Sequence, residues 1–357
     1  MRTKRTIALI GLGNAAQSIH IPAYQKLTGL EIVGGHDQAY SSKSNAAFEF
    51  PIYDSFETLL TRCKPDIVSI ACPTQYHYEI AAKALHAGCH VFCEKPFTST
   101  LEEAKELIEI AEKNNRWIIV NNEFRFMNIY QAAKAKIGTA GFGDLLFVNA
   151  QQNFHVTEQT EAGWRGSDLQ RTCKEFGIHV LDLCRYFFEE EPLTIRARMP
   201  KPGAPAGADY LNLIELEFSG DRVAQITLDR LTKGKHRYLD MRLVGSQSSI
   251  ETEFGGSLQL NAGIRAGDRK PYINFDFSPA GRALQYHGEK RRKLATDPLD
   301  IFAEATSKLL SDFLYALDND TVPACCAQDN IKTLALMLAA YESNELGRAL
   351  PFAAQWS

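Results

Sequence analysis

The sequence lacks a long hydrophobic run, an excess of basic residues and a paired-cysteine motif, and each absence excludes a class of protein. No apolar stretch approaches the roughly 20 residues that a membrane-spanning helix needs, so we expect no membrane partner. The 39 Lys and Arg residues against 43 Asp and Glu residues leave a net charge of −4, without the basic surface that nucleic-acid binding requires. The 357 residues are enough for about two domains of roughly 150 residues each.

The cysteine pattern and the start of the chain predict a cytoplasmic protein. The eight cysteines are scattered through apolar segments without a CxxC pair, which is typical of reduced, mostly buried thiols. The first apolar stretch, Thr6–Leu12, is too short for the hydrophobic part of a secretory signal. The His and Cys residues also lack the spacing of zinc ligands, so we expect no metal site.

The first third of the chain alternates strand and helix patterns. Strand-like runs occupy Thr6–Ile10, Glu31–Gly34, Asp66–Cys72, His90–Cys93 and Trp117–Asn121. Between them, capping-box spacing at Asp54 and Thr100 predicts helix starts, Gly88 is placed to stop a helix, and Pro22 predicts a kink in the first one. Strands that alternate with helices predict βαβ units in a doubly wound parallel sheet.

From Asp144 onwards strand-like runs follow one another, and this change predicts a separate α+β domain. The clearest runs are Leu145–Gln151, Leu211–Phe218, Val223–Leu231, Leu239–Val244 and Ser249–Thr252, with Ser219–Arg222 as a hairpin connection. One strong helix, about Glu175–Phe188, interrupts this series. We expect an α/β domain over residues 1–122 and an α+β domain over 123–357, whose C-terminal helices from about Ala303 are able to pack back on the first domain.

The segment after the first strand has the GxGxxA pattern of a phosphate-binding turn, Gly11-Leu-Gly13-Asn14-Ala15-Ala16. Gly11 permits the tight turn, and Gly13 lets the backbone at Asn14 and Ala15 approach a pyrophosphate at the helix N-terminus. Asp37 ends the second strand-like run, where a carboxylate accepts hydrogen bonds from both ribose hydroxyls of NAD and repels the 2′-phosphate of NADP. The turn therefore predicts an NAD site, with NADP less favoured; the alternative is a plain strand–helix turn with a solvated Asp37.

Lys95 ends the fourth strand-like run, at the sheet edge where ligands bind in open α/β folds. Around it the sequence resembles the glucose–fructose oxidoreductase / inositol dehydrogenase / MocA (Gfo/Idh/MocA) family, densely over residues 6–188 and more loosely afterwards. The matching segments are Gly11-x-Gly13 with His20 and Pro22, Pro65–Pro73 with His77, Ala84–Pro96 with Glu94-Lys95-Pro96, Asn122-x-x-Arg125-Phe126, Trp164-Arg165 and Gly177-x-His179-x-x-Asp182.

The resemblance implies a Rossmann domain, a second domain with a large, mostly antiparallel sheet that usually builds oligomers, and NAD(P)-dependent chemistry on sugars, cyclitols or related alcohols. It places the family's substrate-side lysine on Lys95, and we expect a homodimer or homotetramer with a carbohydrate-like substrate. The expected cofactor contacts then also include Pro73, Thr74, His77, Glu94 and Lys95, and the expected substrate contacts are Arg125, Trp164, Arg165 and Asp182. Packing roles are an equal alternative for Arg125 and Trp164.

On a helix over Glu175–Phe188, at about 100° per residue, one narrow face carries Glu175, His179, Asp182 and Tyr186. The rest of this helix is apolar and should be buried, so the polar stripe needs partners or a cleft. His179 is suited to accept the proton of an alcohol, Glu175 to orient it, and Lys95 to stabilise the developing alkoxide. We expect Lys95 and His179 to converge on one cleft; the alternative is a satisfied core network, which suits Asp182 especially.

These observations favour an oxidoreductase that transfers a hydride between NAD and a secondary alcohol or ketone of a sugar, cyclitol or sugar derivative. Two alternatives stay open, an NAD-retaining glycosidase of the same fold and a non-catalytic dinucleotide-sensing regulator. The family usually has Asp where this chain has Glu175, which leaves the role of Glu175 and the substrate class open. Retention of Lys95 and His179 speaks against the regulator.

Overall fold

The structure is a computed structural model that describes residues 4–40, 48–153, 155, 168–202, 207–233, 237–255, 257–264, 271–278 and 280–355. Its contacts divide the chain into two units. Unit 1 comprises Met1–Phe126 and Phe302–Leu338, and unit 2 comprises Met127–Ile301 and Ala339–Ser357. The segment that returns to unit 1 contains most of the first C-terminal helix and the start of the second.

Unit 1 is built on a five-stranded sheet in the order β2-β1-β3-β4-β5, and every pair in it is parallel. The strands are β1 (Arg5–Ile10), β2 (Leu30–His36), β3 (Ile67–Ile70), β4 (His90–Cys93) and β5 (Ile118–Val120). The strand order reverses between β1 and β3, which makes the carboxyl ends of these strands the expected ligand crevice. The predicted Rossmann domain is confirmed.

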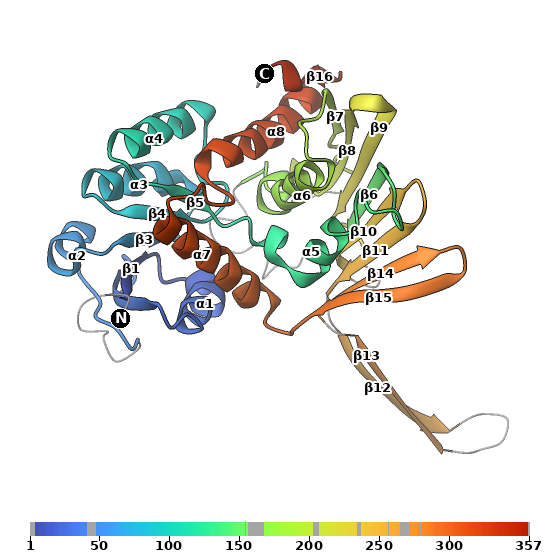
Figure 1. The fold of residues 1–357 in the computed structure, drawn as a ribbon, viewed down its shortest axis with the longest axis horizontal. Helices are drawn as coiled ribbons and strands as arrows, with labels where there is room; N and C mark the ends of the chain where they lie inside the picture. The colour runs from blue at the N-terminus through green and yellow to red at the C-terminus, as the bar shows by residue number, and fades with distance from the viewer. Residues whose placement is uncertain are drawn as a thin grey trace. The chain divides into compact units, whose positions relative to one another are not determined.

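Helices cover both faces of this sheet, with α3 and α4 on one side and α1 and α7 on the other (Figure 1). Leu309, Leu310 and Phe313 of α7 join Ile7 and Leu9 of β1 in one buried core. The helical segments of unit 1 are η1 (Ala16–His20), α1 (Ile21–Gln25), α2 (Phe56–Cys63), η3 (Thr74–Tyr76), α3 (His77–His86), α4 (Leu101–Lys113), η4 (Glu123–Phe126), α7 (Ile301–Asn319) and the first part of α8 (Ala327–Leu346).

Local sequence signals predicted several helix boundaries in unit 1, and one of these predictions is wrong. Thr100 and Glu103 form the predicted capping box at the start of α4, and Gly88 follows α3 with φ +83°. The predicted cap at Asp54 is wrong by one residue, because the Ser55 hydroxyl accepts from the Thr58 N–H at 3.1 Å. Pro22 divides the first helix as predicted, since the π-helical η1 ends at His20 and α1 begins beside the proline.

Unit 2 contains a nine-stranded sheet in the order β15-β14-β11-β10-β6-β9-β8-β7-β16, in which β6 and β9 are the parallel pair. The mostly antiparallel sheet is therefore confirmed. The strands are β6 (Leu145–Asn153), β7 (Thr194–Arg198), β8 (Leu211–Phe218), β9 (Arg222–Asp229), β10 (Arg237–Gly245), β11 (Ser249–Phe254), β14 (Gly281–His287), β15 (Lys290–Asp297) and β16 (Leu350–Pro351), with β12 (Ser257–Ile264) and β13 (Pro271–Ser278) in a separate two-stranded sheet.

One face of the large sheet is covered by helices, and the other face exposes both apolar and charged side chains. Figure 1 shows α5 and α6 on the same side of this sheet. Along β8, Ile214 and Leu216 are buried whereas Leu213 and Glu215 are exposed, which is the alternation of a half-buried strand. The helical segments of unit 2 are α5 (Asn128–Lys134), η6 (Cys173–Gly177), α6 (Ile178–Phe188), η8 (Ser219–Asp221), η9 (Ala353–Gln355) and the end of α8.

Three further predictions from the sequence concern the state of the cysteines, membrane-spanning helices and metal sites. All eight cysteines are free thiols, six of them buried, as predicted. Among the described residues, no helix combines the length and apolar character that crossing a bilayer requires. Within the same part of the chain, no cluster of three His, Cys, Asp or Glu side chains is arranged to hold a metal ion.

Candidate functional site

The glycine turn follows β1, next to the carboxyl end of β3. Gly11 has φ +88°, and a Cβ atom there would lie 2.7 Å from the backbone of Ala71, so only glycine fits. A Cβ atom on Gly13 would meet no atom within 4 Å, which leaves open space over the turn. The Gln17 N–H donates to the Gly13 carbonyl at 3.1 Å, so the N–H groups of Asn14 and Ala15 belong to the first turn of the helix, whose N–H groups have no partner within the helix.

Asp37 lies directly after β2 beside the glycine turn. Its carboxylate accepts the Leu12 N–H at 2.7 Å and the Ala39 N–H at 2.8 Å. The carboxylate is half-buried and anchored to the turn, so it presents a fixed negative charge where a ribose would lie. Ser41, Ser42 and Lys43, which would be able to offset this charge, lie outside the described residues.

The segment after β3 holds the predicted residues Pro73, Thr74 and His77. Pro73 precedes the short helix η3, and Thr74 is its first residue. His77 is buried, with Nε2 2.8 Å from the Cys72 carbonyl oxygen and Nδ1 3.0 Å from the Pro96 carbonyl oxygen. Burial lowers the pKa of this imidazole. The ring therefore ties the segment after β3 to the Glu94–Lys95–Pro96 turn.

Glu94 and Lys95 follow β4 at the same sheet edge. The Glu94 Oε1 atom lies 2.7 Å from His20 Nε2 and accepts a hydrogen bond from the Asn121 side-chain amide at 2.8 Å. Burial raises the pKa of Glu94, but these two donors and the neighbouring Lys95 ammonium outweigh it, so the pKa lies well below its usual range. Glu94 is therefore a carboxylate at neutral pH, next to the half-buried Lys95.

Two polar residues beside this turn were quoted in the sequence only as part of the resemblance. His20 is the partner of Glu94, and its role could not be read from a separation of 74 residues. Asn122 follows β5, and its side-chain amide is buried without a hydrogen-bond partner among the described residues. An orphaned buried amide is a group that a bound ligand can satisfy. Together with the open space over Gly13, it means that the residues present fit a dinucleotide.

In unit 2, the polar helix predicted over Glu175–Phe188 consists of two different segments. Cys173–Gly177 is a π-helix, in which the Ile178 N–H reaches the Cys173 carbonyl, and α6 begins at Ile178. The predicted single α-helix is therefore wrong over Glu175–Gly177, where the backbone is π-helical. His179 and Asp182 lie in α6 as predicted, with exposed fractions of 4% and 1%.

The start of this helix is held by Asp209 from the segment before β8. Its carboxylate accepts the N–H groups of Arg171 at 2.8 Å, Thr172 at 2.9 Å and Cys173 at 3.3 Å. The Tyr341 hydroxyl of α8 donates to the same carboxylate at 2.8 Å. Burial, with Cys173 and Asp209 nearby, raises the pKa of Tyr341, so this donor keeps its proton. These hydrogen bonds to Asp209 fix the start of η6, the segment that contains Glu175 and leads into α6 with His179.

Glu175 and Asp182 each lie beside an arginine. Glu175 Oε2 forms an ion pair with Arg171 Nε at 3.2 Å. Asp182 lies 3.9 Å from the Arg185 guanidinium, which is itself held by Glu191 at 2.6 and 2.7 Å. These surroundings suit the packing alternative for Asp182.

Of the predicted substrate contacts on other segments, the structure describes Arg125. Its guanidinium forms an ion pair with Asp329 at 2.9 Å, and its side chain is 14% exposed. This pair joins η4 to the start of α8 within unit 1, as the packing alternative expects. Trp164 and Arg165 lie outside the described residues.

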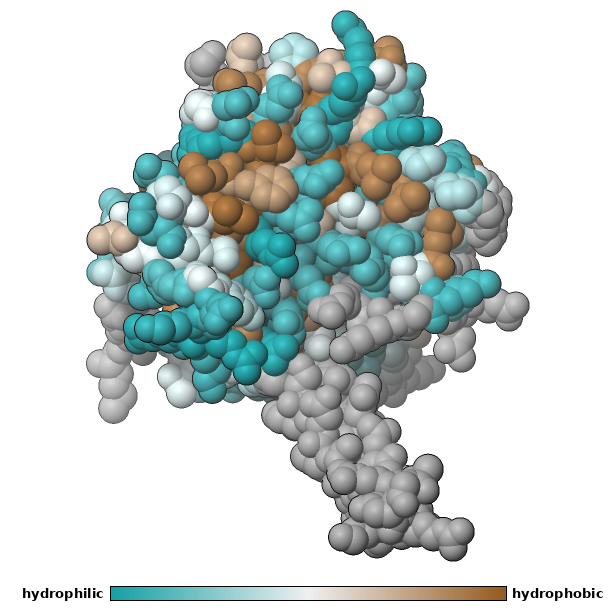
Figure 2. Space-filling view, turned by 90° about the vertical axis from the view of Figure 1, so that its right-hand side faces the viewer, coloured by the Kyte–Doolittle hydropathy of each residue, from teal (hydrophilic) through white to brown (hydrophobic). Residues whose placement is uncertain are grey.

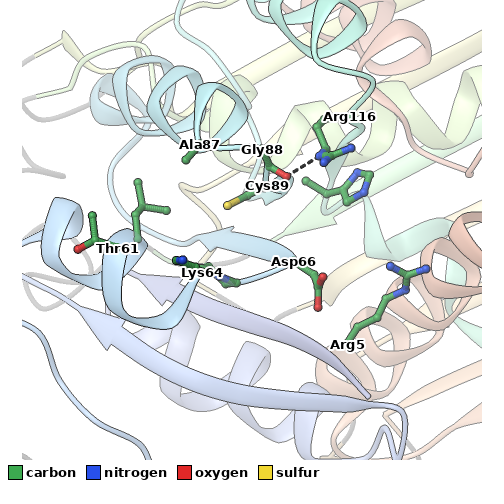
Figure 3. Close-up of a pocket in the computed structure, with 11 residues that line it drawn as sticks. Arg5, Thr61, Lys64, Asp66, Ala87, Gly88, Cys89 and Arg116 are labelled. Atoms are coloured by element: carbon green, nitrogen blue, oxygen red, sulfur yellow. Dashed lines mark hydrogen bonds between the residues drawn. The ribbon is translucent and has the colours of Figure 1, made fainter. Parts of the chain in front are cut away.

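A cavity of about 530 Å³ in unit 1 lies away from the glycine turn, at the amino ends of the parallel strands. Figure 3 shows Arg5, Lys64, Asp66 and Arg116 around it. Lys64 caps α2, and the Arg116 Nε–H donates to the Gly88 carbonyl just after α3. These cations therefore complement the partial negative charge of the helix C-termini.

Two family models match this chain. Residues 5–122 match the Gfo/Idh/MocA model, described as an oxidoreductase family with an NAD-binding Rossmann fold. Residues 130–251 match the Gfo/Idh/MocA C-terminal domain. The two matches correspond to the parallel sheet of unit 1 and to part of the large sheet of unit 2.

Similar proteins include named sugar dehydrogenases. A D-glucoside 3-dehydrogenase of Escherichia coli is 30% identical over 188 residues, which cover 50% of this chain and only 53% of that protein. An oxidoreductase of Synechocystis is 32% identical over 271 residues, 69% of this chain and 70% of the other. A D-apiose dehydrogenase of Paraburkholderia graminis is 24% identical over 362 residues, 96% of this chain and 88% of the other.

Solved structures resemble the fold over its whole length, and one of them is described by its bound ligands. It is an oxidoreductase from Agrobacterium radiobacter in complex with NAD+, L-tartaric acid and magnesium, with a TM-score of 0.80. The superposition covers 99% of this chain and 100% of that one at 20% identity, so it shows a shared fold.

Proposed function

Because this chain belongs to the Gfo/Idh/MocA family of NAD-binding oxidoreductases, we propose that it transfers a hydride between NAD and a secondary alcohol or ketone of a sugar or cyclitol. The observation that carries the proposal is Lys95, which follows β4 at the same sheet edge as the glycine turn. The relatives named as dehydrogenases of a glucoside and of apiose support a carbohydrate substrate. The cytoplasm is the proposed location, from the reduced thiols.

The residues that would hold the dinucleotide lie along the carboxyl edge of the parallel sheet. The turn at Gly11 and Gly13 would receive the pyrophosphate, and Asp37 the adenosine ribose. The Asn122 amide is available to a polar group of the ligand. Bound NAD supplies the hydride acceptor, a capacity that no side chain has.

Lys95 and His179 would have different roles toward the substrate oxygen, the first in charge stabilisation and the second in proton transfer. The Lys95 ammonium stabilises the negative charge that develops on this oxygen as its proton leaves. A neutral His179 imidazole accepts the hydroxyl proton on a ring nitrogen and returns it in the reverse direction. Glu175, which also pairs with Arg171, would orient His179 rather than carry the proton.

The direct test is NADH formation from NAD in a panel of sugars, cyclitols and sugar acids. We expect turnover with at least one neutral sugar or cyclitol and a dependence on Lys95. Release of the aglycone from an aryl glycoside without net NADH would instead identify an NAD-retaining glycosidase. Binding of NAD without turnover of any panel member would support the regulator and contradict the proposal.

We expect the protein to bind NAD at least about tenfold more tightly than NADP, because about 1.4 kcal/mol of repulsion between the Asp37 carboxylate and a 2′-phosphate is enough for that ratio. Asp37→Asn removes the charge but keeps an acceptor for the Leu12 N–H, so the ratio should fall toward one. Calorimetric titration with both nucleotides measures it. Glu31→Gln, at an exposed position on β2, the strand that precedes Asp37, is the control, and tighter NADP binding by the unmodified protein would refute the assignment.

We also propose that the protein is a homo-oligomer that associates through the exposed face of the large sheet. Leu146 and Leu213 on β6 and β8 are 44% and 40% exposed, and Figure 2 shows apolar side chains gathered among polar ones on the surface in view. Light scattering at micromolar concentration should give at least twice the mass of one chain. Leu213→Lys should shift the protein toward monomer, whereas Leu299→Lys, at a 77% exposed position, should not. A monomeric unmodified protein would contradict this proposal.

A further inference from the structure

The cavity of Figure 3 has more cations than carboxylates in its lining. Its volume of about 530 Å³ lies within the range of about 300–1,000 Å³ that small-molecule sites have. The charged residues around it are Arg5, Lys64, Arg116 and Asp66, three cations and one carboxylate. They lie at the amino ends of the parallel strands, opposite the glycine turn, so a ligand here takes no part in hydride transfer.

The ends of α2 and α3 use only part of the donor capacity of these cations. The Lys64 backbone N–H donates to the Leu60 carbonyl at 3.0 Å, and the Arg116 Nε–H donates to the Gly88 carbonyl. The Arg116 Nη1–H donates to the Asn115 carbonyl at 2.9 Å, which fixes the guanidinium. No described residue accepts from Arg116 Nη2 or from the Lys64 ammonium, and none forms an ion pair with either side chain. Both groups are therefore available to an anion.

The other two charged residues of the lining already have partners. Asp66 Oδ2 accepts the Thr6 backbone N–H at 2.7 Å and the Thr6 hydroxyl at 2.9 Å. Arg5 forms an ion pair with Asp318 at 3.1 Å. The positive charge that no carboxylate offsets therefore lies on Arg116 and Lys64.

His90, at the start of β4, adds an uncharged donor to the same lining. Its Nδ1 atom accepts the Trp117 N–H at 3.0 Å, so the proton of the neutral ring lies on Nε2. Burial lowers the pKa of His90 to about 4, and the positive charges of Arg116 and Arg5 contribute to this decrease. The ring is therefore neutral at pH 7, and its Nε2–H has no acceptor in the part of the chain that the structure describes.

We propose that this cavity binds a small phosphomonoester through its phosphate group. A phosphate at pH 7 carries nearly two negative charges on three terminal oxygens, and these accept hydrogen bonds from a guanidinium, an ammonium and an imidazole N–H at once. The same cavity is lined by Leu60, Pro65 and Ala87, whose apolar surface an organic ester covers and a free phosphate ion does not. The site is independent of the hydride transfer proposed above.

Calorimetric titration of the NAD-saturated protein with phenyl phosphate tests the site. Bound NAD fills the glycine turn, and phenyl phosphate has no secondary alcohol, so neither the cofactor site nor turnover contributes to the signal. Arg116→Gln should weaken binding about 10-fold or more, because a charge-assisted hydrogen bond is lost while the amide still has a donor for the Gly88 carbonyl. Arg116→Lys, which keeps the charge without the planar fork, should lose less.

Arg62→Gln is the matched control, because Arg62 is an exposed arginine in the last turn of α2 that does not line the cavity. It should leave the affinity for phenyl phosphate unchanged. Inorganic phosphate should bind more weakly than the ester, and equal affinities would contradict an ester ligand and identify the free ion instead. Absence of phenyl phosphate binding at millimolar concentration, or equal affinities of Arg116→Gln and the unmodified protein, would overturn the proposal.

The imidazole of His90 gives a second measurement that uses the unmodified protein and so does not depend on the folding of a variant. Proton NMR follows the titration of its ring, with the signal assigned by its absence from His90→Gln. Saturation with phenyl phosphate should raise the pKa of His90, because a bound anion stabilises the charged ring. An unchanged pKa at saturation would place the phosphate elsewhere on the protein and contradict the proposal.

Discussion

Replacement of Lys95 by Ala is expected to lower kcat/KM for the preferred sugar or cyclitol by about 100-fold or more. The physical reason is the loss of a fixed positive charge where negative charge develops on the substrate oxygen, and losses of this size follow removal of one such group. NAD affinity should fall much less, because the glycine turn and Asp37 are unchanged. Steady-state kinetics of NADH formation, with calorimetric NAD binding, measure both quantities.

Lys64→Ala is the control for this variant. Lys64 belongs to the same unit but lies at the amino ends of the strands, beside the cavity of Figure 3. Its removal should leave turnover unchanged. A Lys95→Ala protein that folds normally and stays within threefold of the unmodified kcat/KM would contradict the proposed chemistry.

Replacement of His179 by Ala is expected to lower kcat/KM about 100-fold or more, through the loss of the group that accepts the hydroxyl proton. An imidazole accepts a proton only when it is neutral, so the rate of alcohol oxidation should rise with pH through one ionisation in the unmodified protein. This rise should disappear in His179→Ala. The pH profile of kcat/KM therefore distinguishes a proton acceptor from a packing residue.

Two further variants complete this test. Glu175→Gln should lower kcat/KM less than His179→Ala does, because Glu175 forms an ion pair with Arg171 and does not carry the proton. His287→Ala, at an exposed position of β14, should have no effect on turnover. The packing alternative for the buried His179 predicts the opposite pattern, with unchanged kcat and a lower melting temperature.

The two units differ in how well local sequence signals predicted them. In unit 1, the five strands and the ends of α3 and α4 follow from apolar runs, Thr100 and Gly88, because caps and buried parallel strands depend on neighbouring residues. In unit 2, β7, β14 and β15 were not predicted. Lys290–Asp297 begins with four basic residues, which suit an edge strand and have no apolar alternation.

Local reasoning also failed where the helix geometry changes. The straight-helix calculation treated Glu175–Phe188 as one α-helix, but Cys173–Gly177 is a π-helical turn and α6 begins at Ile178. This turn is held by Asp209, more than thirty residues away in the chain, and by Tyr341 on α8. No spacing in the sequence could reveal an acceptor that lies so far from the N–H groups it binds.

The sequence by itself determined the fold family, the phosphate turn with Asp37, and the candidate pair Lys95 and His179, because each depends on a residue type at a fixed place in a local pattern. Only the tertiary structure decided which groups support them: His20 and Asn121 on Glu94, Arg171 on Glu175, and Asp209 at the helix start. The physical reason is that burial makes a polar group find a partner wherever the fold brings one, regardless of separation along the chain.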